Sequence, residues 1–170
     1  GMAPVRAFRL SYVGELGYEL HHPIEYQRYL YDLLMEAGAP FEIVDWGYRA
    51  LDSMRLEKAY RLWGVDMSAD WTPLEAGMER FVALDKPAFV GREALLQLKA
   101  QGLRRRLVSM IIDCDGAPAQ PGDSIYDGEG LVGSVTTGGY GHRVAATIAL
   151  GFIELASAQE GRRRASVILG

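Results

Sequence analysis

The spacing of apolar and polar residues divides the chain into two parts with different patterns. Up to residue 102, short alternating runs of the kind found in strands stand beside longer segments whose apolar residues recur every three or four positions, as in amphipathic helices. From residue 103 onward, short strand-like runs follow one another, separated by turns rich in glycine and aspartate. The pattern predicts an α+β fold with a first domain over residues 1–102 and a small all-β barrel domain over residues 103–170.

Helix and turn signals place the elements of the first part. Two strands, at 5–12 and 17–22, flank a turn that contains glycines, and a helix follows Pro23. Further along the chain, the pattern predicts a strand at 41–44, a helix from about 46 to 60 with Asp45 as its N-cap, a strand at 80–85 and a helix from 92 to 102.

The second part is predicted to form strands at 106–112, 123–126, 131–137, 145–152 and 164–169. Its segment TGGYG, at 137–141, is rich in glycine but lacks the Gly-Lys-Ser/Thr ending and the following helix of a phosphate-binding loop. It is typical of a hairpin turn whose residues need a positive φ. The other interpretation is a loop that closely approaches a ligand.

Composition and charge exclude several classes of function. The net charge of −4 gives no basic footprint for nucleic acid, and no apolar run approaches the roughly 20 residues of a membrane span. A single cysteine, Cys114, excludes an internal disulfide and the cysteine pairs of zinc sites, and the three histidines form no metal-binding pattern. We therefore expect a cytoplasmic protein without a metal site, while its oligomeric state stays open.

The most unusual polar position is Glu19, because glutamate is depleted in strands. Alternation along the strand places Glu19 on one face together with Gly17 and His21. One interpretation is a solvated sheet face. The other is a carboxylate in a pocket, accepting hydrogen bonds from adjacent N–H groups of a planar heterocycle, with Tyr12 of the neighbouring strand supplying a ring face or a hydroxyl.

Cationic and aromatic residues offer further candidates for ligand binding. Arg49 falls in the first turn of its helix, where the helix dipole disfavours a cation. It can serve as a surface ion pair or bind an anionic or carbonyl-bearing part of a ligand. Trp46, Trp63 and Trp71 are typical of a core, and they also suit the walls of a pocket for a flat ligand. The sequence contains no recognisable nucleophile motif.

Several blocks occur in the order in which one enzyme family carries them: SYVGELGYEL, ALDSMRLEKAYRLWGVDM, TPLEAGM and FVALDKPAFVGREAL. The chain thereby resembles the folate-binding aminomethyltransferase family, which includes the T-protein of the glycine cleavage system. The segments GELGYEL and RLEKAYRLWG are more similar to the C-terminal regions of dimethylglycine and sarcosine dehydrogenases than to the T-protein. The resemblance implies the C-terminal half of the folate domain, an antiparallel sheet with packed helices, over 1–102, and the family's C-terminal β-barrel over 103–170.

The resemblance also implies an activity and a set of ligand contacts. The family transfers a one-carbon aminomethyl unit to tetrahydrofolate, giving methylenetetrahydrofolate. By position, Glu19 is implied to bind the edge of the pterin, Tyr12 to line the folate pocket and Arg49 to contact the folate, with Arg143 as a weaker candidate for the folate tail. The alternative is a non-catalytic folate-binding or assembly module of the same superfamily.

One departure from the family limits what the chain is expected to do alone. In the family, the folate domain begins well upstream of the SYVGELGYEL block, and its catalytic acid lies in that earlier half. The resemblance therefore implies a fragment whose catalytic residues are outside this chain and whose partner is the missing N-terminal half or a flavin domain. FAD would belong to the parent dehydrogenase, and we expect the chain by itself to be inactive.

Overall fold

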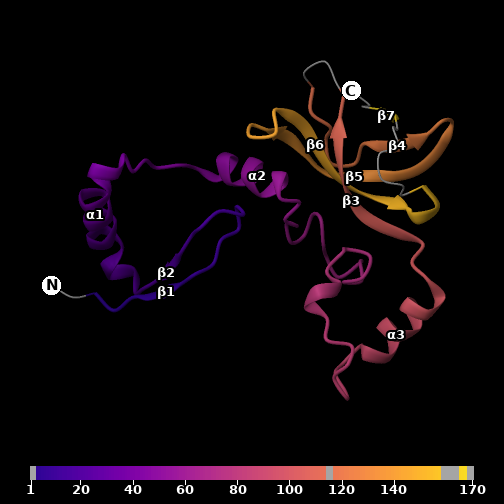
Figure 1. The fold of residues 1–170 in the computed structure, drawn as a ribbon, viewed down its shortest axis with the longest axis horizontal. Coiled ribbons are helices and arrows are strands. Elements are labelled where there is room, and N and C mark those ends of the chain that lie inside the picture. The colour runs from indigo at the N-terminus through magenta and orange to yellow at the C-terminus, as the bar shows by residue number, and fades with distance from the viewer. Residues whose placement is uncertain (1–2, 114–116, 158–164, 168–170) are drawn as a thin grey trace.

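A computed structural model describes residues 3–113 and 117–157, together with the backbone of 165–167. Cys114 and half of the strand predicted at 164–169 lie outside the described residues. In Figure 1 the N-terminal elements extend away from a C-terminal sheet, and α2 lies between the two. The chain has the expected fold class, in which antiparallel strands and helices are followed by a small β domain.

The N-terminal elements follow the predicted order but with shorter strands. β1 (Arg6–Phe8) pairs antiparallel with β2 (Glu19–His21), and a 3-10 turn (Ile24–Tyr26) leads into α1 (Gln27–Gly38). Pro23 stands just before this turn, as expected for a residue without an N–H group. The expectation that Tyr12 lies on a strand is wrong, because β1 ends at Phe8 and Tyr12 belongs to the loop.

The next segment lacks the two strands that the sequence pattern predicts. The segment at 41–44 forms no strand, because a 3-10 turn (Ala39–Phe41) ends in Glu42, which has a left-handed backbone with φ of 57°. The segment at 80–85 also forms no strand: a 3-10 turn (Glu79–Phe81) covers its first two residues, and irregular and turn backbone follows.

Two helices lie on either side of that second 3-10 turn. α2 (Tyr48–Glu57) begins after Gly47, and α3 (Arg92–Gln101) ends as expected at Gly102. Asp45 does not cap α2; its carboxylate accepts a hydrogen bond of 2.6 Å from the Tyr31 hydroxyl of α1 instead.

The C-terminal domain is an antiparallel five-stranded sheet with the strand order β3-β6-β5-β4-β7. The strands are β3 (Arg105–Ile112), β4 (Ser124–Asp127), β5 (Gly130–Gly141), β6 (Ala146–Glu154) and β7 (Ala165–Val167). This arrangement follows the strand pattern of the sequence.

The interpretation of TGGYG as a turn is wrong, because the whole segment lies inside β5. None of its glycines has a positive φ, and the connection to β6 comes after it. A Cβ atom on Gly138 would lie only 1.8 Å from the carbonyl oxygen of Ala119. Glycine is therefore required there for close approach of two backbone segments.

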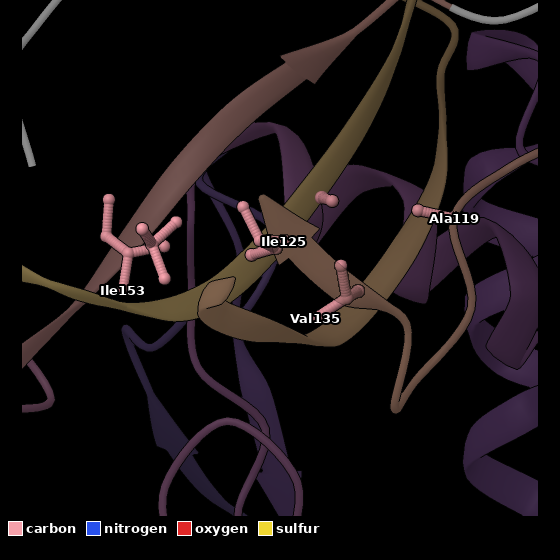
Figure 2. Close-up of a cluster of buried hydrophobic side chains, with 6 residues drawn as sticks. Ala119, Ile125, Val135 and Ile153 are labelled. Atoms are coloured by element: carbon pink, nitrogen blue, oxygen red, sulfur yellow. The ribbon is translucent and has the colours of Figure 1, made fainter. Parts of the chain in front are cut away.

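Two buried clusters stabilise the C-terminal half. The first lies within the β domain (Figure 2) and contains Ala119, Ile125, Val132, Val135, Ala149 and Ile153. The second packs Leu56 of α2 against Leu107, Ile148, Leu150 and Phe152 of the sheet. This second cluster attaches α2 to the β domain, since burial of an aliphatic side chain of this size contributes roughly 2 kcal/mol.

The tryptophans do not share one environment. The indole ring of Trp71 stacks on Phe152 with a centroid distance of 3.9 Å, and the Arg105 guanidinium lies over its other face. Trp46 and Trp63 are 54% and 69% exposed. The core interpretation therefore holds for Trp71 alone of the three.

The N-terminal half exposes most of its large apolar side chains. Among residues 3–54, none is buried. We call the following set of exposed residues the N-terminal apolar surface: Val5, Phe8, Leu10, Leu16, Tyr18, Leu20, Ile24, Tyr29, Tyr31, Leu33, Leu34, Phe41, Ile43, Val44, Trp46 and Tyr48. Exposed apolar area on this scale is typical of an interaction surface. Of the helices in the described residues, none has the length and apolarity to cross a membrane.

Candidate ligand-binding site

Glu19 lies on an exposed face of the β1–β2 pair. Its backbone pairs with that of Phe8, and its Oε2 atom lies 3.1 Å from Nε2 of His21, so the two side chains share a face as the alternation predicts. The ring of Phe8 meets His21 edge-on at 4.9 Å. The Glu19 side chain is 53% exposed. The described residues around it form a solvated platform and do not enclose the carboxylate.

Tyr12 is held against the segment that follows α2. Its hydroxyl donates a hydrogen bond of 2.6 Å to the carbonyl of Arg61, and its ring is tilted against that of Tyr60 at 6.1 Å. Burial raises the pKa of the Tyr12 hydroxyl above its ordinary value, so the group stays protonated at neutral pH. Because its only hydrogen is already donated, Tyr12 offers a ligand its ring face and an oxygen lone pair.

Arg49 lies in the first turn of α2 and is exposed. It forms no ion pair with any described residue, so the ordinary role of a surface salt bridge is not realised for this side chain. Among the described residues, no hydrogen bond or ion pair joins any two of Tyr12, Glu19 and Arg49. The structure therefore does not join the three side chains by direct polar contacts.

The loop between β1 and β2 contains a shallow, open hollow of about 320 Å³. Its lining residues are Arg9, Leu10, Ser11, Glu15, Leu16 and Gly17. The lining residues flank Tyr12 on both sides in sequence and precede Glu19, but neither Tyr12 nor Glu19 lines the hollow. The described residues thus form an open surface, on which the aromatic, acidic and basic candidate groups are separate from the hollow.

The turn at the tip of the same loop reaches the C-terminal domain. Glu15 pairs with the guanidinium of Arg143, whose backbone N–H also donates to Oε1 of Glu57 at 2.7 Å. The neighbouring Gly14 packs so closely on Lys58 that a Cβ atom would lie 2.4 Å from its Cγ. Arg143, a weaker candidate for the folate tail, is therefore engaged in joining the loop to the β domain.

Sequence reasoning missed a buried polar cluster behind Tyr12. Nη1 of Arg55 lies 2.7 Å from Oδ2 of Asp66, and Nε lies 2.8 Å from Oδ1 of Asp52. The side chains of Arg55 and Asp66 are 1% and 0% exposed. Burial lowers the pKa of Arg55, but the charges and hydrogen bonds of Asp52 and Asp66 outweigh it and raise the pKa above its ordinary value.

The sequence carries a weak signal for this cluster. Arg55 follows Arg49 and Asp52 at a spacing of three residues, a pattern typical of charges along one face of a helix. An acidic residue inside the apolar segment WGVDM indicates a buried and paired charge, since an unpaired one would be strongly destabilising. Nothing local identifies its partner.

Comparison with known proteins decides the family. The family model of the GCVT N-terminal domain matches residues 1–86, and that of the glycine cleavage T-protein C-terminal barrel domain matches residues 105–170. The chain belongs to the glycine cleavage T-protein family. It is 42% identical over 168 residues to the mitochondrial dimethylglycine dehydrogenase of Homo sapiens, covering 98% of this chain and 19% of that protein.

Aminomethyltransferases match over a larger share of their own length. The aminomethyltransferase of Halothermothrix orenii is 37% identical over 159 residues, covering 94% of this chain and 44% of that protein. The crystal structure of glycine cleavage system aminomethyltransferase T from Bartonella henselae superimposes with a TM-score of 0.86 at 31% identity, covering 95% of this chain and 45% of that one. The chain therefore spans less than half the length of these relatives of the T-protein family.

Proposed function

We propose that this chain forms one wall of a tetrahydrofolate site and takes part in aminomethyl transfer that yields methylenetetrahydrofolate, in a protein of the dimethylglycine or sarcosine dehydrogenase type. The observation that carries the proposal is the T-protein family match along nearly the whole chain, together with a half-exposed carboxylate at position 19. Substrate choice among the methylamines lies outside what these residues determine.

The chemistry of Glu19 suits the polar edge of a pterin. A carboxylate accepts two parallel hydrogen bonds, and the pterin ring presents an amino group beside a ring N–H. Oε2 of Glu19 faces His21, whereas Oε1 makes no hydrogen bond with the described residues. One oxygen is thus available without breaking a contact to any residue that the structure describes.

Tyr12 and Arg49 complement this acceptor. The hydrogen bond from the Tyr12 hydroxyl to the Arg61 carbonyl holds the side chain in place, and its ring offers a face for a flat heterocycle. The exposed guanidinium of Arg49 provides a planar fork of donors for a carboxylate or carbonyl of the folate. The two groups bind and orient the ligand, which is how a protein lowers the barrier of a transfer between two bound reactants.

The proposed site is open to solvent, and a further part of the protein is needed to enclose it. We place the contact with that part on the N-terminal apolar surface. The solved aminomethyltransferase has more than twice the length that this chain covers. We propose that polypeptide equivalent to the first half of the folate domain packs on this surface, encloses Glu19 and supplies the catalytic acid. Exclusion of water would then protect the reactive one-carbon unit from hydrolysis. Any flavin would be bound by a part of the protein other than these residues.

A calorimetric titration of the complete gene product with tetrahydrofolate tests the proposal. We expect Glu19→Gln to weaken binding at least about tenfold, because an amide replaces one acceptor by a donor and removes the charge from the remaining hydrogen bond. Glu25→Gln is the matched control: this acid is also exposed, four residues past His21 and two past Pro23 in the same segment, and its replacement should leave the affinity unchanged.

Two outcomes would count against this function. Equal affinities of the wild-type protein and Glu19→Gln would remove Glu19 from the site. Tetrahydrofolate binding without formation of methylenetetrahydrofolate from an aminomethyl donor would favour the non-catalytic folate-binding module.

A further inference from the structure

A β-bulge in β5 brings two consecutive threonine hydroxyls to one carboxylate. The register between β5 and β6 shifts between Val135 and Thr137, so Thr136 is the extra residue. Consecutive side chains of a regular strand point to opposite faces, whereas a bulge re-aims one of them. Here both hydroxyls donate to the same atom, Oδ1 of Asp66, and the distance from Thr137 is 2.7 Å.

Asp66 connects this bulge to α2. Its other oxygen, Oδ2, accepts hydrogen bonds from Nη1 of Arg55 at 2.7 Å and from the N–H of Leu62 at 2.9 Å. Arg55 also lies 3.3 Å from the Thr137 hydroxyl, through Nη2. Because both charges are almost fully buried, their mutual geometry is fixed: any other arrangement would leave a charge without compensation.

Arg55 in turn holds the segment on which Tyr12 rests. Its Nη1 donates to the carbonyl of Tyr60 at 2.9 Å, and the next carbonyl, that of Arg61, accepts the Tyr12 hydroxyl at 2.6 Å. The Arg61 guanidinium fixes the same segment from the other side, through the carbonyls of Ala59 and Ala76. The contacts form a continuous path from β5 to Tyr12.

We propose that Thr136, Thr137, Asp66 and Arg55 form a positioning unit, through which the C-terminal β domain fixes Tyr12 and the Arg49-bearing helix α2 for folate binding. The inference rests on the proposed tetrahydrofolate site. The four residues act through Tyr12 and α2 and do not touch the ligand. The β domain thus becomes a determinant of affinity for a ligand that binds to the other domain.

The decisive variant is Thr136→Val combined with Thr137→Val, which removes both hydroxyls while nearly preserving side-chain volume. The first measurement needs no ligand: it follows the Cζ signal of ¹³C-labelled tyrosine, assigned to Tyr12 with Tyr12→Phe. We expect this signal to move in the double variant. The second measurement is tetrahydrofolate affinity of the complete gene product, which we expect to fall about tenfold. Thr137→Ser, which keeps a hydroxyl, should stay within about twofold of wild type.

Ile153→Val provides the matched control, because it weakens the other buried cluster of the β domain without a hydrogen bond to the positioning unit. It should change neither the Tyr12 signal nor the affinity. If the double variant does not fold, the two single valine variants carry the same test.

The outcomes separate the positioning unit from the folate site itself. An unchanged Tyr12 signal in the valine variants overturns the positioning unit. So does an unchanged affinity when Glu19→Gln, measured alongside, weakens binding. If the wild-type protein does not bind tetrahydrofolate while the Tyr12 signal still moves, the proposed function fails and the coupling between the β domain and Tyr12 stands.

Discussion

Replacing Asp66 by alanine is expected to lower the free energy of unfolding by about 3–5 kcal/mol. The substitution leaves the Arg55 guanidinium buried without its closest counter-ion and removes the acceptor of both bulge hydroxyls. A domain of this size is stable by only about 5–15 kcal/mol, so the effect would bring the chain close to unfolding. Urea unfolding followed by tryptophan fluorescence measures it, since Trp71 stacks on Phe152 beside the α2 contact.

Asp70→Ala is the control for this experiment. Asp70 is an exposed acid a few residues further on, bonded to the Ser68 hydroxyl, and its removal should change stability by less than about 0.5 kcal/mol. Replacing both partners, with Arg55→Met and Asp66→Leu together, should recover much of the loss because no uncompensated charge remains. A cost below about 1 kcal/mol for Asp66→Ala would show that the buried pair does not stabilise the fold.

Gly138→Ala is expected to destabilise the β domain by at least about 2 kcal/mol. The added Cβ atom would lie 1.8 Å from the carbonyl oxygen of Ala119, a backbone atom that cannot rotate away as a side chain can. Thermal unfolding followed by circular dichroism gives the change in midpoint.

Two glycines of the same strand form a graded control series. Gly139→Ala should cost less, since its nearest neighbour is the flexible end of Leu56 at 3.2 Å, and Gly130→Ala should be almost neutral, with 3.5 Å to the nearest atom. Equal effects of all three alanine substitutions would contradict a steric origin.

Much of the secondary structure could be predicted from local signals. The helix after Pro23, the helix that ends at Gly102 and the strands of the β domain follow from starts, stops and turns that each act over a few residues. The strands predicted at 41–44 and 80–85 failed for a different reason. A short apolar run becomes a strand only where another strand pairs with it, and this pairing is not encoded locally.

Glycine-rich segments were ambiguous for a physical reason. A positive φ and a close approach between backbones both select glycine, and the sequence does not distinguish the two. The glycines of TGGYG fit a turn on the sequence alone, whereas Gly138 is required by the contact with Ala119 inside β5.

The candidate site was predictable in part. Alternation correctly placed Glu19 beside His21, but the partner of Tyr12 could not be deduced, because the Arg61 carbonyl is 49 residues away in sequence. The bond between Asp66 and Thr137 spans 71 residues and depends on a bulge, which the strand pattern does not reveal. The role of a residue in contacts this distant in sequence can be recognised only once the fold is known.

The most direct test of the folate site is a crystal structure of the complete gene product with tetrahydrofolate bound. We expect the N–H groups of the pterin edge within hydrogen-bonding distance of the Glu19 carboxylate, with the ring system against Tyr12. A bound folate at another place, with Glu19 still exposed and paired with His21 alone, would contradict the proposed site.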